Sequence, residues 1–264
     1  MTNHLLEVTV PVAPLRADPS DRSEMVSQLI AGERCRLLQR GEKDWVQVEL
    51  MMDSYRGWCD MKQLTVCSPQ DEAVQSRHAV LTQAPISLWS LEGGAQCVLP
   101  ASARLTCDLE GAWRLGAERL EPLNSLDACL APCALPLDAA MNFLGAPYLW
   151  GGKTIMGIDC SGLIQVAFAL CGVRMPRDAS AQVHSGNPID WSNRASGDLA
   201  FFANEEGAVI HVGILTKELS ILHAAGQVRI DDLDARGIRK DEDYTHQFHS
   251  LRRVNDSARS QVEQ

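Results

Sequence analysis

Short runs of alternating apolar and polar residues fill the first 70 positions of the chain. Val8, Val10 and Val12 occupy alternate positions, and Trp45-Val46-Gln47-Val48 alternates again after a polar turn. A period of two places successive side chains on opposite faces of a strand, and no helical period competes with it here. Residues 1–70 are therefore predicted to form a small β-barrel.

Residues 71–128 repeat this pattern less clearly. Strand-sized apolar segments occur at 86–89 and 104–107. Both halves place an Asp or Gly shortly before a strand that contains tryptophan, Trp45 in the first half and Trp113 in the second. This weak internal repeat favours a second, divergent barrel that is related to the first.

After residue 130 the period changes to that of a helix. Apolar residues stand at 163, 164, 167, 168 and 171, and Gly172 is suited to end the helix. Strand-like segments follow at 198–202, 209–215, 219–224 and 227–230. A helix followed by an antiparallel sheet predicts an α+β domain, so the expected domains are 1–70, 71–128 and 129–264.

Composition restricts the partners and the compartment. The 264 residues carry a net charge of −10, which argues against nucleic acid or an anionic membrane as the main partner. The start of the chain has neither a basic segment nor a long apolar core, and no apolar run approaches the ~20 residues of a membrane span. The nine cysteines, an odd number without C-x-x-C spacing, favour a reducing compartment. A cytoplasmic protein without a structural metal is expected.

The segment Asp159-Cys160-Ser161-Gly162 stands directly before the predicted helix. Unpaired N–H groups at a helix start favour a thiolate, which is the attacking species in covalent cysteine catalysis. Most buried cysteines serve only packing, and Asp159 is either a helix N-cap or a substrate-binding group. The placement of Cys160 nevertheless favours a nucleophile.

Two histidines in the following strands supply a partner for this cysteine. If 209–215 and 219–224 form a hairpin with a three-residue loop, residue 213 faces 221 and His211 faces His223. Their Cβ atoms would then lie roughly 5 Å apart on one face of the sheet. His223 can thus orient His211, whereas His184, His246 and His249 are interpreted as solvated or structural.

These residues predict a hydrolytic mechanism without a metal or organic cofactor. Cys160 attacks a carbonyl, and His211 forms an ion pair with it and later protonates the leaving amine. Backbone N–H groups at the start of the helix stabilise the oxyanion, and water hydrolyses the thioester.

At these residues the chain resembles the NlpC-type family of cell-wall cysteine peptidases, which are papain-like in fold. The resemblance covers roughly 135–254 and rests on six ordered motifs. They are Pro147-Tyr148-Leu149-Trp150-Gly151-Gly152, Asp159-Cys160-Ser161-Gly162, Pro176-Arg177-Asp178-Ala179-Ser180-Ala181-Gln182, Gly197-Asp198-Leu199-Ala200-Phe201-Phe202, His211-Val212-Gly213-Ile214 and Leu222-His223-Ala224. The resemblance implies Cys160 as nucleophile, His211 as base and His223 as the third residue.

The two barrels ahead of this domain resemble bacterial SH3-like domains. That combination is similar to the branch that cleaves γ-D-glutamyl-L-diamino acid bonds in murein peptides with a free N-terminal L-Ala. The resemblance implies that Tyr55 and Glu24 of the first barrel help recognise the alanine. It also implies substrate-binding roles for Trp150, Asp159, Ser161 and Asp178, while Ala179 replaces the serine common in the branch.

The expected protein is thus a cytoplasmic cysteine endopeptidase of murein peptide recycling, whose partner is the peptide substrate. Two alternatives remain open at this point. One is a secreted enzyme that remodels intact wall, and the other is a wall-binding adaptor without activity. The sequence does not distinguish lysine from diaminopimelate in the substrate, and it leaves the oligomeric state open.

Overall fold

The computed structural model describes residues 4–67, 79–108 and 110–254. The chain divides into a first unit, Met1–Pro132, and a second unit, Cys133–Gln264. The expected boundary between residues 70 and 71 lies outside the described residues. The second boundary was expected after residue 128, and the structure divides the chain after Pro132. Cys129 belongs to the first unit, because it packs in the core of that unit's second sheet.

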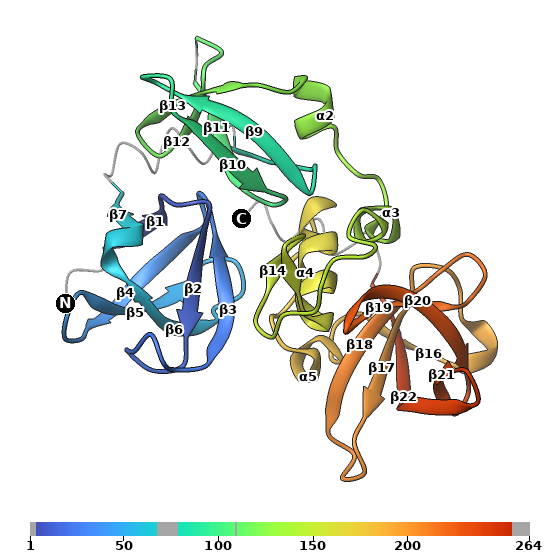
Figure 1. The fold of residues 1–264 in the computed structure, drawn as a ribbon. Coiled ribbons are helices and arrows are strands. Elements are labelled where there is room, and N and C mark those ends of the chain that lie inside the picture. The colour runs from blue at the N-terminus through green and yellow to red at the C-terminus, as the bar shows by residue number, and fades with distance from the viewer. Residues whose placement is uncertain (1–3, 68–78, 109, 255–264) are drawn as a thin grey trace. The chain divides into compact units, whose positions relative to one another are not determined.

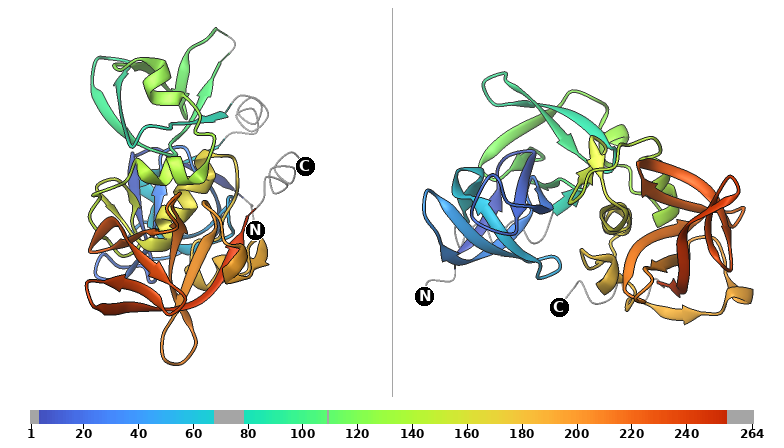
Figure 2. Two further views of the ribbon diagram at one scale, coloured as in Figure 1. Left: turned by 90° about the vertical axis from the view of Figure 1, so that its right-hand side faces the viewer. Right: turned by 60° about the horizontal axis from the view of Figure 1, so that its bottom comes forward.

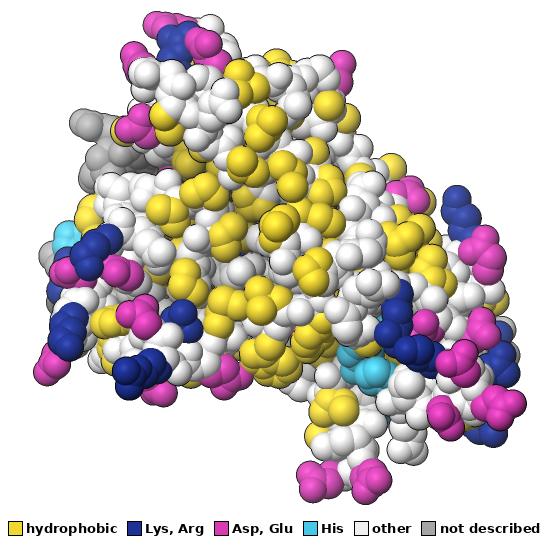
Figure 3. All heavy atoms as spheres, viewed as in Figure 1, with side chains coloured by type: hydrophobic (Ala, Val, Ile, Leu, Met, Phe, Trp, Pro, Cys, Tyr) yellow, Lys and Arg dark blue, Asp and Glu magenta, His cyan; other side chains and the backbone are white. Residues whose placement is uncertain are grey.

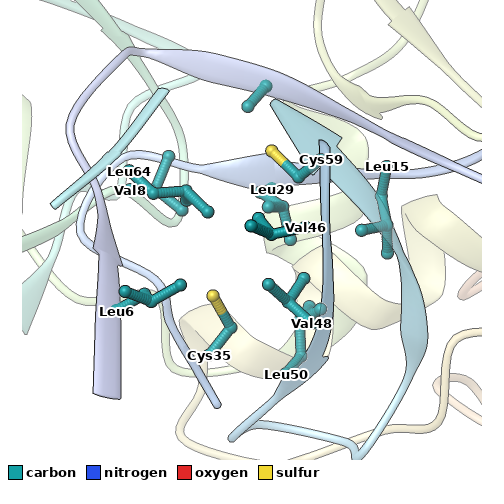
Figure 4. Close-up of a cluster of buried hydrophobic side chains, with 11 residues drawn as sticks. Leu6, Val8, Leu15, Leu29, Cys35, Val46, Val48, Leu50, Cys59 and Leu64 are labelled. Atoms are coloured by element: carbon teal, nitrogen blue, oxygen red, sulfur yellow. The ribbon is translucent and has the colours of Figure 1, made fainter. Parts of the chain in front are cut away.

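A seven-stranded sheet with the order β3-β2-β6-β5-β4-β1-β7 forms the first half of the first unit (Figure 1). Its strands are β1 Leu5–Val8, β2 Val12–Arg16, β3 Met25–Ile30, β4 Arg34–Arg40, β5 Trp45–Leu50, β6 Arg56–Asp60 and β7 Leu64–Val66, with the 3-10 helix η1 Met61–Gln63 before β7. Alternate side chains of these strands meet in one apolar core, which Figure 4 shows with Val46 and Val48 among them. Burial raises the pKa of the Cys59 thiol in this core to about 12, so Cys59 is an inert packing residue.

The second half of the first unit is a six-stranded sheet with the order β10-β9-β13-β12-β11-β8. Its elements are β8 Ala79–Leu81, β9 Ile86–Leu91, β10 Gln96–Pro100, β11 Arg104–Cys107, β12 Trp113–Leu115 and β13 Glu118–Pro122, followed by helix α2 Leu126–Leu130. Trp89 is fully buried and donates its indole N–H to Ser87 Oγ at 2.8 Å. Leu88 and Val98 face each other across β9 and β10 and are exposed, and Figure 3 shows hydrophobic side chains at the surface over these strands.

The two sheets of the first unit are joined through the end of β3. Ile30 and Ala31 pack in the core of the second sheet, and the Arg104 N–H donates to Ala31 O at 2.8 Å. Gly32 follows with φ +75, and a Cβ there would lie 2.0 Å from Arg104 O. Only glycine fits this close approach, because both the torsion and the space exclude a side chain.

Helix α4, Cys160–Leu170, is the central element of the second unit. The stripe predicted from the sequence is confirmed, since Leu163, Ile164 and Ala167 are fully buried. The helix contacts β18 and β19, as Figures 1 and 2 show, and it also contacts helix α3. A Cβ on Gly162 would lie 2.3 Å from Gly152 O, so glycine lets the helix start approach the preceding loop closely.

The remaining elements of the second unit form a seven-stranded sheet and short flanking pieces. They are α3 Pro136–Met141, β14 Lys153–Thr154, β15 Gly157–Ile158, α5 Ala179–Gln182, β16 Asn187–Ile189, η2 Trp191–Asn193, β17 Leu199–Ala203, β18 Val209–Leu215, β19 Ile221–Ala225, β20 Gln227–Asp234, β21 Gly237–Lys240 and β22 Asp243–Arg253. The sheet order is β16-β22-β17-β18-β19-β20-β21, and an additional pairing of β21 with β22 closes it into a barrel (Figure 2).

The register of the β18–β19 hairpin differs from the sequence-based expectation by two residues. Gly213, not His211, faces His223. The loop is longer than expected because the Thr216 N–H donates to Ser220 O at 2.9 Å, and Leu219 takes a positive φ of 62. The predicted direct pairing is therefore wrong, but a shift of two positions keeps both histidines on the same face.

Among the described residues, none of the helices has the length and apolar character needed to span a membrane.

Candidate active site

Cys160 occupies the first position of α4, and the fold places it beside His211. Its side chain is buried, and its sulfur accepts hydrogen bonds from the backbone N–H groups of Ser161 and Val212. Val212 directly follows His211 on β18, so this hydrogen bond holds the helix start against the strand that carries the histidine. The contact explains why a residue some fifty positions away becomes a neighbour of the cysteine.

Burial decides the protonation state of Cys160. It raises the pKa of the thiol to about 11, and the nearby Asp159 carboxylate adds to the rise. The two backbone N–H groups and Arg177 act in the opposite direction without prevailing. The helix start was expected to favour a thiolate, but desolvation of the charge outweighs that effect. The resting site therefore holds a neutral thiol.

His211 and His223 form a buried, hydrogen-bonded pair. His211 Nε2 lies 2.8 Å from His223 Nδ1, and the two rings are nearly perpendicular, at 87°. Burial lowers the pKa of both imidazoles, in His211 assisted by the neighbouring His246 and His223. Both rings are thus neutral at neutral pH, and His211 can act as a base.

The pair continues to a carboxylate that the sequence analysis did not single out. His223 Nε2 lies 3.0 Å from Asp231 Oδ2, which also accepts from Arg229 Nε at 2.8 Å. Burial alone would raise the pKa of the Asp231 carboxyl. The hydrogen bonds from His223 and Arg229 outweigh burial and hold this pKa below its usual range. The fourth predicted strand, 227–230, stopped one residue short of Asp231, whereas β20 extends to Asp234.

His246 packs beside the site, which favours the structural one of the two roles expected for it, solvated or structural. Its ring stacks on that of His211, and it comes from β22, a strand absent from the sequence-based prediction. The period-two pattern of Tyr244, His246 and Phe248 could have revealed the strand. Figure 3 shows histidine side chains reaching the surface over the second unit, beside basic groups.

Asp159 caps α4 and is paired with a buried arginine. Its carboxylate accepts from the N–H groups of Gly162 at 2.7 Å and Gly151 at 2.8 Å, and from Arg177 at 2.6 and 3.0 Å. Arg177 also donates to Ser161 Oγ at 2.9 Å. Because both carboxylate oxygens are occupied and the charge is balanced, these contacts favour the capping role of Asp159. Its substrate-binding role, like that of Ser161, stays a prediction.

Tyr148 is a further residue near the thiol that sequence reasoning missed as a site residue. Burial raises the pKa of its hydroxyl to about 12, and the proximity of Cys160 and Asp159 contributes. The hydroxyl therefore remains a hydrogen-bond donor at the site. Trp150 on the same loop and Asp178 before α5 are both exposed, and their substrate-binding roles stay predictions.

The two remaining predicted residues lie in the first unit. Tyr55 is half-buried against the core of the first sheet, and Glu24 is exposed. Met25 of β3 and Trp58 of β6 both face Arg16 of β2, so Glu24 and Tyr55 lie at the same end of that sheet. Their role in recognition stays a prediction. No cluster of three or more His, Cys, Asp or Glu with metal-binding geometry occurs within the described part of the chain.

Comparison with known families supports this assignment of the two units. The model of the NlpC/P60 family matches residues 145–246, and that of the bacterial dipeptidyl-peptidase SH3 domain matches residues 15–64. The first match contains Cys160, His211 and His223, and the second contains Glu24 and Tyr55.

Two curated relatives are similar over most of the chain. The gamma-D-glutamyl-L-lysine dipeptidyl-peptidase of Bacillus subtilis (strain 168) is 27% identical over 216 residues, which are 75% of this chain and 71% of the relative. The protein of the same name from Bacillus cereus (strain ATCC 10987 / NRS 248) is 24% identical over 229 residues, 78% of this chain and 68% of the relative.

Solved structures show the same fold. An NlpC/P60 family protein from Bacillus cereus ATCC 10987 has a TM-score of 0.78 at 22% identity, covering 95% of this chain and 99% of that one. An NlpC/P60 endopeptidase from Photobacterium damselae subsp. piscicida has a TM-score of 0.67 at 16% identity, covering 86% of this chain and 66% of the other.

Proposed function

Because the chain belongs to the NlpC/P60 family of cysteine peptidases and carries a bacterial dipeptidyl-peptidase SH3 domain, we propose that it hydrolyses the γ-D-glutamyl-L-diamino acid bond of murein peptides with a free N-terminal L-Ala. The observation that carries the proposal is the hydrogen bond to the Cys160 sulfur from the N–H of Val212, the residue after His211, together with the hydrogen-bonded His211–His223 pair. The names of the two Bacillus relatives, which cover most of the chain, support the γ-D-glutamyl substrate class.

The proposed reaction starts from a neutral thiol and a neutral imidazole. His211 takes the proton of Cys160 as the sulfur attacks the γ-carbonyl of D-Glu, so no charged pair has to be buried beforehand. In this proposal the oxyanion accepts hydrogen bonds from N–H groups at the helix start and from the Tyr148 hydroxyl, which stays protonated. His211 then protonates the leaving α-amine of the diamino acid, and water hydrolyses the thioester. His223 orients His211 throughout.

The substrate's alanine is assigned to exposed polar groups of the two units. A free ammonium group is best bound by a carboxylate that has solvent access, because a buried charge needs a partner already in place. Asp178 and Glu24 are exposed carboxylates, whereas Asp159 is buried. We assign Glu24, Tyr55, Asp178, Ser161, Trp150 and Asp159 to the binding of the peptide.

The proposal also covers the fold class of the catalytic unit and the compartment in which the protein acts. The catalytic unit, a helix against a sheet with Cys160 at the helix start, is assigned to the papain-like class. Murein peptide recycling in the cytoplasm fits the partly exposed free thiols Cys97 and Cys107, which an oxidising compartment would put at risk. The partner is the peptide itself, with no nucleic acid or membrane surface involved.

Hydrolysis of defined peptides tests the function. L-Ala-γ-D-Glu-L-Lys and its diaminopimelate counterpart are incubated with the wild type and with Cys160→Ala, His211→Ala and Cys171→Ala. The last variant makes the same change at the opposite end of α4 and should retain activity. Cys160→Ala and His211→Ala should release no diamino acid. Full activity in either variant would contradict the assignment.

Two further substrates separate the alternatives. N-acetylation of the alanine should block cleavage, and equal cleavage of capped and free peptides would contradict recognition of the N-terminus. Digestion of intact sacculi would instead support a secreted remodelling enzyme. If neither the peptides nor the sacculi are cleaved, the protein is a binding adaptor.

A further inference from the structure

The hydrogen bonds of the active-site histidines do not end at His223. His211 Nε2 contacts His223 Nδ1, and the second nitrogen of His223 contacts Asp231 Oδ2 at 3.0 Å. His223 is fully buried, so water does not substitute for either partner. Asp231 lies on β20, where His223 faces Arg229 and Asp231 follows two positions later on the same face of the strand.

Arg229 determines which atoms donate in this series of hydrogen bonds. A guanidinium can only donate, and its Nε–H is directed at Asp231 Oδ2 at 2.8 Å. Asp231 stays ionised between Arg229 and His223, so its oxygen is an acceptor. The proton between His223 and Asp231 must therefore sit on His223 Nε2.

The remaining protons follow from the neutrality of the two rings. A neutral imidazole carries one N–H, so His223 Nδ1 is an acceptor. His211 Nε2 must then donate to it, because the two nitrogens are 2.8 Å apart. Of the four ring nitrogens, His211 Nδ1 alone neither carries a proton nor accepts a hydrogen bond from the other ring. That is the tautomer that a base for the Cys160 thiol requires.

We propose that Asp231 is a positioning residue of the peptidase reaction, which fixes the tautomer of His223 and thereby leaves Nδ1 of His211 free to take the Cys160 proton. The inference rests on the proposed function for its kinetic test. Asp231 does not touch the substrate or the thiol and acts only through His223. Arg229 holds it in place and is itself anchored by donating to Ala225 O at 2.8 Å.

Two substitutions of Asp231 separate the acceptor from the rest of the side chain. Asp231→Ala removes the acceptor, so that His223 can adopt either tautomer. Asp231→Asn keeps it, because Arg229 can donate but not accept a hydrogen bond and so holds the amide oxygen, not the amide nitrogen, at the Oδ2 position. Asp232→Ala is the matched control, since Asp232 is the next residue of β20 and pairs with Arg239 at an exposed position.

Kinetics on the γ-D-glutamyl peptide give the first measurement. Asp231→Ala should lower kcat by about 10- to 100-fold with KM nearly unchanged, the loss typical of a group that orients an active-site histidine. Asp231→Asn should recover most of kcat, and Asp232→Ala should match the wild type. A kcat for Asp231→Ala equal to that of Asp232→Ala overturns the proposal, and so do equal losses in Asp231→Ala and Asp231→Asn.

Nitrogen-15 NMR of the histidine rings gives a second measurement that needs no substrate. The wild type and Asp231→Asn should both show His211 and His223 protonated at Nε2, whereas Asp231→Ala should show a mixture at His223. Protonation of His223 at Nδ1 in the wild type overturns the proposal. If the wild type cleaves no γ-D-glutamyl peptide, the proposed function fails, while the NMR spectra still decide the role of Asp231.

Discussion

The imidazole of His246 stacks on that of His211, with ring centroids 4.1 Å apart and an angle of 26° between the planes. Phe202 contacts both rings from a third strand. The base of the proposed reaction is thus enclosed on one side by a second histidine. Burial lowers the pKa of His246 to about 4, and the nearby His223 and Arg229 add to the shift. His246 is therefore a neutral stacking partner at neutral pH.

The lowered pKa of His246 makes the stability of the second unit depend on pH. The pKa of His246 is about 4 in the folded protein against an ordinary 6.5, so between these values the unfolded chain binds more protons. The free energy of unfolding should therefore fall as the pH is lowered through that window. His246→Phe keeps an aromatic ring but cannot take up the proton, so it should weaken this dependence in urea unfolding at pH 5 and pH 7.5. His249→Phe, on the same strand but exposed, should leave it unchanged.

Alkylation of Cys160 should report a neutral thiol. Because burial raises the pKa of Cys160 to about 11, the rate of its reaction with iodoacetamide should rise by about tenfold per pH unit from pH 7 to 10. Mass spectrometry of the peptide that contains Cys160 measures the rate separately from the other cysteines. A rate that is already constant at neutral pH would indicate a thiolate paired with protonated His211.

Tyr148→Phe should lower kcat by about 10²-fold, the usual loss for one oxyanion donor. The hydroxyl stays protonated because burial raises its pKa to about 12, so it can donate throughout the neutral range. Steady-state hydrolysis of the γ-D-glutamyl peptide measures the effect. Tyr244→Phe, a change of the same kind on β22, serves as the control, and equal activity of the two variants would remove Tyr148 from the mechanism.

Arg177→Met should destabilise the second unit by about 3–5 kcal/mol, since it leaves the Asp159 carboxylate buried without its charged partner. Urea unfolding measures the loss. Arg236→Met removes a charge paired at an exposed position and should change stability by less than about 1 kcal/mol. A small effect of Arg177→Met would mean that the N–H groups of Gly151 and Gly162 alone suffice for Asp159.

The sequence determined the features of the site that depend on neighbours along the chain. The helical stripe, the Asp159 cap and the position of Cys160 at the helix start are all local, and the structure contains each of them. The faces of β18 and β19 are also local, because alternation alone decides which side chains share a side. His211 and His223 therefore meet even though the predicted register was displaced by two residues.

Only the tertiary structure decided which distant groups complete the site. Arg177, Asp231 and His246 reach it from a loop, from β20 and from β22, and no local period relates them to Cys160. The protonation of Cys160 was decided in the same way, because burial depends on what the fold packs around the helix start. The sequence thus fixes where the nucleophile and its base lie along the chain. Closure of the barrel decides their surroundings, and with them the charge state of the thiol.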